Sequence, residues 1–327
     1  MKVLVLSEHD VEQLLTMEEC IEVMEDALRA LARGEVHNPL RQAIRAPGAP
    51  GLLGLMPAWR GGERPVYALK EVCVFPGNPA RGLDTHLGAV LLHSGETGEL
   101  LAVVNASAVT AIRTAAVSAV ATKLLAREGA KTLAILGAGV QARSHLEAMR
   151  LVRRIEEVRV YSRTPRADAL LNVGRASARP EQRRAEARRT LSAEEAVRDA
   201  DLIVTATSSK EPVLRREWIA DGAHINAVGS SIATARELDS DTVRAASLFV
   251  DRRESTVNES GDYLMAGPGV EIKAELGELL LGRAEGRRTE TEITLFKSLG
   301  LAVEDLASAS FLYDKAVRVG AGTWVGF

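Results

Sequence analysis

The sequence predicts an α/β protein in which a doubly wound parallel sheet is joined to a second, smaller α+β domain. Three observations predict this class. The chain of 327 residues exceeds the usual size of one compact domain. Short β-rich runs fill the region from about residue 36 to 104, whereas strand-like and helix-like segments alternate from about residue 132 onwards.

Composition favours small-molecule chemistry. Apolar residues make up 46% of the chain and charged residues 26%, which is typical of a globular protein with a sizeable core. Lys and Arg number 41 against 44 Asp and Glu, and the resulting charge of -3 provides no general field for nucleic acid or anionic lipid. We therefore expect a small-molecule partner, with neither nucleic acid nor a membrane as a binding surface.

The chain shows no sign of export. Its apolar runs are shorter than the ~18 residues of a membrane span, and the N-terminal run is shorter than a signal segment. Cys20 and Cys73 lack the spacing of a metal or redox motif. We expect both cysteines to be reduced core thiols in a cytoplasmic protein.

Local signals predict the elements of the first region. A capping box of Thr16 and Glu19 begins an amphipathic helix that ends at Gly34. An antiparallel sheet is indicated by the β-rich runs "YALKEVCVF", "LGAVLLH" and "LLAVVN". The Ala-rich stretch from residue 107 to 126 predicts a long helix that connects the two domains.

The second region has the pattern of a parallel sheet. Its strand-like runs alternate with helical segments, one of which begins with a capping box of Ser192 and Glu195. The runs are "TLAIL", "VRVYS", "DLIVTAT", "HINAVG" and "SLFVD". An Arg-rich stretch over 174–190 lacks interleaved aromatics, which favours a solvated surface over a nucleic-acid site.

A glycine loop follows the first strand of this region. Gly137 permits a tight turn, Gly139 lets the backbone approach a pyrophosphate, and the small Ala142 lets helix and strand pack closely. A helix that begins near Gln141 directs its first N–H groups at the anion. The strand–turn–helix context favours a Rossmann dinucleotide site over an ordinary structural turn.

The end of the next strand, "VRVYSRTPR", bears on cofactor choice. Ser162, Arg163 and Thr164 offer hydroxyls and a guanidinium with no carboxylate, which suits the 2′-phosphate of NADP. We therefore expect NADP(H) as the preferred cofactor, with NAD(H) as a second possibility. The alternative is that Arg163 is only a solvent-facing charge of the loop. The candidate cofactor contacts are Gly137, Ala138, Gly139, Val140, Gln141, Ser162, Arg163, Thr164, Thr205, Ala206, Thr207, Val228, Gly229 and Ser298.

Several stretches together resemble the ornithine cyclodeaminase/mu-crystallin family along essentially the whole chain. They are "GLLGLMPAW", "ALKEVCVFPGNP", "AVTAIRTAAVSAVAT", "LGAGVQA", "INAVG" and "TLFKSLG". The resemblance implies a Rossmann domain over 119–304, inserted into a substrate-binding and dimerisation domain formed by 1–118 with 305–327. It also implies a homodimer.

The resemblance assigns candidate catalytic residues by position. Lys70 matches the family's active-site lysine, and Arg113 and, within a shorter motif, Arg45 match arginines that bind a carboxylate. Two guanidiniums can clamp an α-carboxylate, whereas an ion pair is the alternative role for each of the three. Arg113 favours the functional role because its Ala-rich helix carries little other charge. The resemblance further indicates Thr85, Gly54 and Met56 as pocket residues.

Two departures from the family pattern concern the substrate. The family's cyclodeaminases carry an aspartate where this chain has Ser231 and a glutamate where it has Gly54. A diamine placed in such a pocket would leave a desolvated ammonium without a carboxylate, at a cost of several kcal/mol. A cyclic imine has no second amine. The mu-crystallin branch, which has a hydroxyl at the Ser231 position, reduces cyclic ketimines with NADPH.

We therefore expect an NAD(P)H-dependent reductase of cyclic ketimine carboxylates such as Δ1-pyrroline-2-carboxylate or Δ1-piperideine-2-carboxylate, giving L-proline or L-pipecolate. Ser231 would hydrogen-bond near the imine nitrogen. The alternatives are an ornithine or lysine cyclodeaminase, an alanine dehydrogenase-like enzyme, and a non-catalytic NADP-dependent small-molecule binder. The six histidines show no metal-ligand spacing, so we expect no metal and assign them core or surface roles.

Overall fold

The computed structural model describes residues 2–164, 167–171 and 186–327. It divides into two compact units, one formed by Met1–Arg113 with Leu301–Phe327 and the other by Thr114–Gly300. The chain passes from the first unit to the second within helix α3 (Ala106–Leu125). Most of the Arg-rich stretch lies outside the described residues, and its end forms strand β10 (Glu186–Arg189).

Unit 1 contains a mixed sheet in the order β16-β1-β7-β6-β5-β4-β2, with β3 paired to β4. β1 and β7 are parallel, and the other neighbours are antiparallel. The strands are β1 (Lys2–Leu6), β2 (Val36–His37), β3 (Gln42–Ile44), β4 (Leu52–Arg60), β5 (Val66–Val74), β6 (His86–Ser94), β7 (Leu100–Asn105) and β16 (Thr323–Gly326). The helices are α1 (Glu8–Leu14), α2 (Met17–Arg33), the 3-10 helix η1 (Asn78–Arg81) and α11 (Ala302–Val319).

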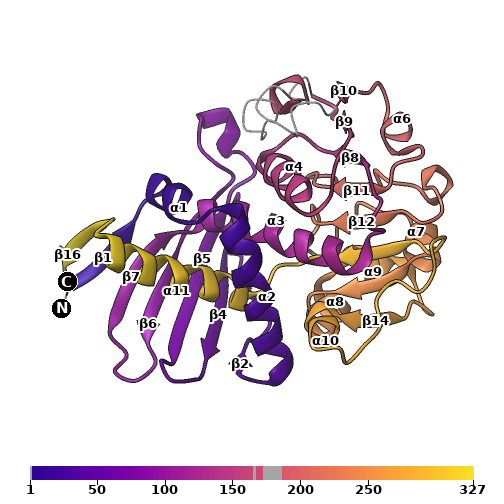
Figure 1. Cartoon of the computed structure of the whole chain (residues 1–327). Coiled ribbons are helices and arrows are strands. Elements are labelled where there is room, and N and C mark those ends of the chain that lie inside the picture. The colour runs from indigo at the N-terminus through magenta and orange to yellow at the C-terminus, as the bar shows by residue number, and fades with distance from the viewer. Residues whose placement is uncertain (1, 165–166, 172–185) are drawn as a thin grey trace. The chain divides into compact units, whose positions relative to one another are not determined.

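Helices cover one face of this sheet. α11 lies across β4 to β7 and packs against α2, as Figure 1 shows. α2 begins at Thr16, whose hydroxyl accepts from the Glu19 N–H while the Glu19 carboxylate accepts from the Thr16 N–H, and it ends at the left-handed Gly34. The predicted capping box and helix end are confirmed. Met24 and Leu28 of its apolar face are fully buried.

Unit 2 contains a fully parallel sheet in the order β10-β9-β8-β11-β12-β15-β13-β14. With β10 it comprises β8 (Thr132–Leu136), β9 (Glu157–Tyr161), β11 (Leu202–Thr205), β12 (His224–Ala227), β13 (Ser247–Val250), β14 (Ile272–Glu275) and β15 (Thr294–Lys297). The helices are α4 (Val140–Val152), α6 (Ala193–Val197), α7 (Ser240–Ala245), α8 (Arg253–Glu259), α9 (Gly261–Ala266) and α10 (Leu276–Leu280), with the 3-10 helix η3 (Arg216–Trp218).

Both faces of the parallel sheet are covered. On one face Leu136, Ile203 and Ile225 join a core with residues of α6, α7 and α9. On the other face the second half of α3 and α4 pack, and the Asn226 amide donates to Thr122 of α3. The order of the first strands reverses between β8 and β11, as in doubly wound dinucleotide-binding sheets. The predicted doubly wound fold is confirmed.

Two smaller predictions need correction. The Ser192 hydroxyl accepts from the Glu195 N–H, but the Glu195 carboxylate accepts from the Leu191 N–H and not from Ser192, so the capping box is only half formed. Both cysteines are free thiols, yet only Cys20 is a core residue. Cys73 is exposed on β5, because alternate residues of a strand point to opposite faces and Cys73 lies on the face without helices.

Among the described residues, α3 alone is long and apolar enough to pass for a membrane span, and 67% of that window is buried inside the structure. Burial of this extent is typical of a core helix. Its apolar composition follows from contacts on several sides, since a helix that packs all round carries apolar residues all round.

Candidate active site

A buried lysine lies on the helix-covered face of the unit 1 sheet. Lys70 of β5 pairs directly with Met56 of β4, two positions from the pair of Gly54 with Val72. Because residues two apart on a strand share a face, all four side-chain positions point to the same side. Lys70 is 3% exposed and Met56 7% exposed. The predicted pocket residues Gly54 and Met56 therefore share this face of the sheet with Lys70.

Lys70 belongs to a four-residue ion cluster, which we call the unit 1 cluster: Lys70, Arg113, Glu304 and Asp305. Lys70 Nζ lies 2.7 Å from Asp305 Oδ2. Arg113 donates from Nε to Asp305 Oδ1 at 3.1 Å and from Nη1 to Glu304 Oε2 at 2.6 Å. Lys70 Nζ also lies 3.4 Å from the Thr110 hydroxyl of α3. Two cations thus meet two carboxylates, and all four residues are buried.

The helix of Arg113 carries little other charge, as expected, and both carboxylates that bind Arg113 come from α11. Glu304 and Asp305 occupy the first turn of α11, where carboxylates are stabilised by the helix dipole. They are distant from Arg113 in sequence, and only the packing of α11 brings them to α3. A buried arginine without such partners would be severely destabilising, so the acids keep it charged in the core.

Burial and charge act in opposite directions on the two cations. Burial lowers the pKa of Lys70 to about 8, with the positive charges of Arg113 and Arg41 acting in the same direction and Asp305 opposing them. For Arg113, burial alone would lower the pKa, but the neighbouring Asp305 and Glu304 outweigh it and the pKa is raised. Lys70 can therefore exchange a proton near neutral pH, whereas Arg113 stays charged.

The structure does not bring Arg45 to this cluster. Arg45 is exposed in the segment after β3. Arg41, which precedes β3, is half-buried, and its charge acts on Lys70. Thr85 is half-buried just before β6, and its carbonyl accepts from the Phe75 N–H. Of these two arginines, Arg41 is the one whose charge acts on Lys70.

The glycine loop of unit 2 has the backbone features of a phosphate-binding turn. Gly137 has φ +121°, and a Cβ there would lie 2.3 Å from the Ala206 carbonyl oxygen, so only glycine fits. Gly139 precedes α4 without any side-chain cap, and a Cβ added to it would meet no heavy atom within 4 Å. Ala142, in the first turn of α4, is fully buried. α4 thus begins at a glycine without a side-chain cap, as do helices that bind a phosphate at their N-terminus.

Residues after β11, β12 and β15 lie at the same edge of the sheet as this loop. Val228 and Gly229 donate their N–H groups to the Thr205 carbonyl, and Ser298 donates to Ala227. Gly229 is also held closely, since a Cβ there would lie 2.3 Å from the Thr207 carbonyl oxygen. The predicted cofactor residues of these strands thus gather at the carboxyl edge, where ligands bind in doubly wound sheets.

The loop after β9 is held by contacts between its own residues. The Thr164 N–H donates to the Ser162 hydroxyl at 3.3 Å, and the two hydroxyls lie 3.2 Å apart. Arg163 between them is exposed. The guanidinium is therefore presented to solvent from a short turn at the end of the second strand.

The two serines after β12 have different surroundings. The Ser230 hydroxyl is buried and donates to the Ala235 carbonyl at 2.6 Å, which is a structural role. Ser231 is half-buried. Of the pair, Ser231 is the hydroxyl that a ligand at this edge could reach.

Two histidines of unit 2 belong to the core. His145 contacts the Gln141 carbonyl at 2.7 Å and the Ser118 hydroxyl at 2.9 Å, and burial lowers its pKa to about 4. His224 contacts Thr294 Oγ1 at 2.9 Å, and burial lowers its pKa to about 3.

In the part of the chain that the structure describes, no group of three or more His, Cys, Asp or Glu is placed to hold a metal ion.

The parallel sheet, its switch point and the glycine loop define a Rossmann-type dinucleotide-binding fold. The chain belongs to the ornithine cyclodeaminase/mu-crystallin family, whose sequence profile matches residues 1–320. The family predicted from the sequence is thus confirmed.

Three similar proteins carry specific names. Ketimine reductase mu-crystallin of Mus musculus is 41% identical over 282 residues, which is 86% of each chain. Δ1-pyrroline-2-carboxylate reductase of Thermococcus litoralis, solved with NADH and L-proline, is 41% identical, with a TM-score of 0.93 over 98% of this chain and 99% of that one. An archaeal alanine dehydrogenase dimer with bound NAD is 35% identical, with a TM-score of 0.92 over 100% of both chains.

Sequence reasoning missed several of these residues, although each left a signal. Glu304 and Asp305 form an acidic pair inside the apolar run "LGLAVEDLA". Lys297, which is buried and lies 3.0 Å from Asp262, is a lone charge in the apolar strand "TLFK". A charge that interrupts a buried run needs a partner. The sequence gives no distance information, so the partner could not be named from it.

Proposed function

We propose that this chain is an NAD(P)H-dependent reductase of cyclic ketimine carboxylates, of the Δ1-pyrroline-2-carboxylate or Δ1-piperideine-2-carboxylate type, that gives L-proline or L-pipecolate. The observation that carries the proposal is the half-buried Ser231 at the carboxyl end of β12, where a hydroxyl stands in place of an acid. The names of two of the relatives, ketimine reductase and pyrroline-2-carboxylate reductase, agree with this function.

Unit 2 would hold the dinucleotide. The cradle at Gly139 and the N-terminus of α4 fit a pyrophosphate, and the close contact of Gly137 with Ala206 fixes the turn that carries it. When bound, the reduced nicotinamide supplies the hydride. Ser231 would orient the substrate by a hydrogen bond near its imine nitrogen.

Unit 1 would bind the substrate carboxylate and supply a proton. Arg113 uses Nε and Nη1 for Asp305 and Glu304, which leaves Nη2 for a substrate carboxylate. Arg41 takes the place of Arg45 as the second guanidinium, because its charge reaches Lys70. Lys70, with a pKa of about 8, is charged at neutral pH and can donate a proton to a ketimine nitrogen. A protonated imine is the form that accepts a hydride.

NADP(H) is the cofactor we prefer, on the strength of the exposed Arg163 in the turn of Ser162 and Thr164. A guanidinium there would bind a 2′-phosphate, whereas an acid would bind the ribose hydroxyls. The Arg163→Ala variant should lose its preference for NADPH over NADH. Arg154→Ala, which removes another exposed arginine of unit 2, serves as the control. An unchanged ratio in Arg163→Ala would refute this assignment.

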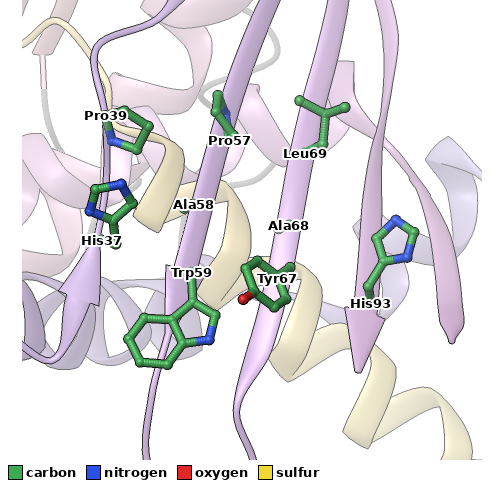
Figure 2. A pocket seen from close by; sticks show the side chains of 9 residues that line it. All are labelled: His37, Pro39, Pro57, Ala58, Trp59, Tyr67, Ala68, Leu69 and His93. Atoms are coloured by element: carbon green, nitrogen blue, oxygen red, sulfur yellow. The ribbon is translucent and has the colours of Figure 1, made fainter. Parts of the chain in front are cut away.

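We also propose a homodimer formed through the helix-free face of the unit 1 sheet. Figure 2 shows Pro57, Trp59, Tyr67 and Leu69 pointing away from the helices. Together with His37 and His93 they line a hollow of about 280 Å³. Tyr67 is 52% exposed, and its ring lies 6.4 Å from that of Trp59. Apolar patches of this kind mark protein interfaces. Light scattering after gel filtration should report a dimer for the wild type and a monomer for Tyr67→Asp.

The cellular location that we propose is the cytoplasm. Cys20 and Cys73 are both free thiols, and unpaired cysteines persist in a reducing compartment.

The decisive experiment measures NADPH and NADH oxidation by the purified protein with pyrroline-, piperideine- and thiazoline-type carboxylates. We expect turnover with the cyclic imines. Conversion of ornithine to proline with release of ammonia, without added reduced cofactor, would instead identify a cyclodeaminase. Reductive amination of pyruvate as the main activity would identify an alanine dehydrogenase, and dinucleotide binding without oxidation by any imine would identify a non-catalytic binder.

Variants of the unit 1 cluster test the roles of its residues. Lys70→Ala and Arg113→Ala should each lower turnover by orders of magnitude while NADPH binding survives, because the dinucleotide site is assigned to unit 2. Retained turnover in both variants would refute the assignment of these two residues.

A further inference from the structure

The carboxylate of Glu237 joins the two loops that follow β11 and β12. It accepts hydrogen bonds from the Thr207 N–H and hydroxyl on Oε1, both at 2.7 Å. On Oε2 it accepts from the Thr205 hydroxyl at 2.8 Å and from the Gly229 N–H at 2.7 Å. Glu237 is fully buried, so these four donors replace its hydration.

The backbone of Glu237 is itself held in place. Asp262 Oδ1 of α9 accepts from the N–H groups of Glu237 and Leu238, at 2.8 and 2.9 Å. The other carboxylate oxygen of Asp262 lies 3.0 Å from Lys297 Nζ, and Lys297 donates to the Ser230 carbonyl at 2.6 Å. Both side chains are buried. The contacts form a closed ring that returns to the segment from Gly229 to Ser230.

The ring borders the glycine loop. Gly137 lies against the Ala206 carbonyl, and Ala206 stands between the two threonines that donate to Glu237. Gly229 leaves no room for a Cβ beside Glu237, whose Oε1 would lie 2.4 Å from it. The loops after β8, β11 and β12 are therefore in contact. Glu237 links the loops after β11 and β12 by hydrogen bonds.

We propose that Glu237 is a positioning residue for the dinucleotide: by fixing Thr207 and Gly229, it holds the carboxyl-edge loops of unit 2 in the conformation that binds the cofactor. This inference rests on the proposed function, since it presupposes that unit 2 binds a dinucleotide. It assigns Glu237 no contact with the reacting atoms.

Glutamine is the sharpest substitution because it keeps the shape of Glu237. Both carboxylate oxygens accept a backbone N–H, so in Glu237→Gln the amide nitrogen must face either the Thr207 or the Gly229 N–H, and donor then meets donor. The loops after β11 and β12 must then move apart, and the dinucleotide must return them to the binding conformation when it binds. We expect the Kd for NADPH, measured by its fluorescence, to rise about tenfold or more.

Glu292→Gln is the matched control. Glu292 precedes β15, at the amino edge of the same sheet, and also accepts from a backbone N–H and a hydroxyl, those of Arg288 and Ser247. A merely structural role for Glu237 would lower the Tm of Glu237→Gln without raising its Kd for NADPH above that of Glu292→Gln, in which the amide can still accept from the Arg288 N–H and donate to the Ser247 hydroxyl. We expect the Kd of Glu292→Gln to match the wild type, and the KM of Glu237→Gln for the imine at saturating dinucleotide to stay unchanged.

Thr205→Val provides a second variant should Glu237→Gln fail to fold. It keeps the side-chain shape and removes one of the four donors, so we expect a smaller rise in Kd than with Glu237→Gln. Wild-type affinity in both variants, or in Thr205→Val if only that variant folds, would overturn the positioning role. A wild-type protein that binds neither NADPH nor NADH would overturn the proposed function instead.

Discussion

Lys70 of β5 and Asp305 of α11 form a buried ion pair, with Nζ 2.7 Å from Oδ2 and both side chains almost fully inaccessible to solvent. Asp305 also binds the Nε of Arg113. One carboxylate therefore fixes the two cations that are the candidates for proton donation and carboxylate binding.

Removing the Asp305 charge should destabilise unit 1. Asp305→Asn leaves Lys70 and Arg113 short of one buried counter-charge, and breaking a buried pair in this way costs about 3–5 kcal/mol. Asp314→Asn, on the same helix, breaks an exposed pair with Arg64 and should change little. Denaturant unfolding measures both variants. Equal stability of the two would show that Asp305 does not compensate the buried cations.

The rate of imine reduction should depend on the ionisation of Lys70. Because its pKa is about 8 instead of the ordinary 10.5, the ammonium loses its proton as pH rises through about 8, and kcat/KM should fall there. The contribution of Lys70 to the stability of the fold should change with pH in the opposite direction. Between pH 8 and 10.5 the unfolded chain binds more protons at this residue, so its contribution to the free energy of unfolding rises with pH.

Lys70→Arg separates this ionisation from that of the substrate. A guanidinium does not titrate in this range, so whatever activity the variant retains should lack the fall near pH 8. A fall that persists unchanged in Lys70→Arg would belong to the imine and not to Lys70.

Arg41 and Arg45 should behave differently although both belong to one short segment. Arg41→Ala removes a positive charge that lowers the pKa of Lys70, so the fall in kcat/KM should move to higher pH. The KM for the imino acid should also rise, since we assign Arg41 to the carboxylate. Arg45 is exposed, so Arg45→Ala should leave both parameters within about twofold of the wild type. The reverse pattern would restore Arg45 as the second guanidinium.

Replacing Gly137 by alanine should destabilise the fold, whereas replacing Gly139 should weaken dinucleotide binding. Gly137→Ala places a Cβ against the Ala206 carbonyl in a left-handed backbone conformation, so the Tm of the ligand-free protein should fall. Gly139→Ala has ordinary φ and open space, so the fold should tolerate it while the methyl group fills the phosphate cradle. Thermal unfolding with and without NADPH measures both effects. A Gly139→Ala variant that binds NADPH with wild-type affinity would contradict the assignment of the cradle.

Local patterns determined much of the fold. The Thr16–Glu19 capping box, the Gly34 stop and the strand–glycine–helix pattern at Gly137 are encoded within a few residues, and each was predicted where the structure places it. The alternation of strands and helices likewise predicted a parallel sheet, because parallel strands need crossover segments. Lys70 and Arg113 became candidate site residues through the resemblance of their short motifs to the family.

Only the tertiary structure decided how these residues are paired. Arg113 meets Asp305 across 192 positions of sequence, and Glu237 meets Thr205 across 32, because helix packing and strand order bring them together. The choice between Arg41 and Arg45 depended on where the chain leaves β3 and on which arginine acts on Lys70. Local periodicity specifies which face of an element is buried, but the partner of a buried charge is set by long-range register, which no spacing along the sequence records.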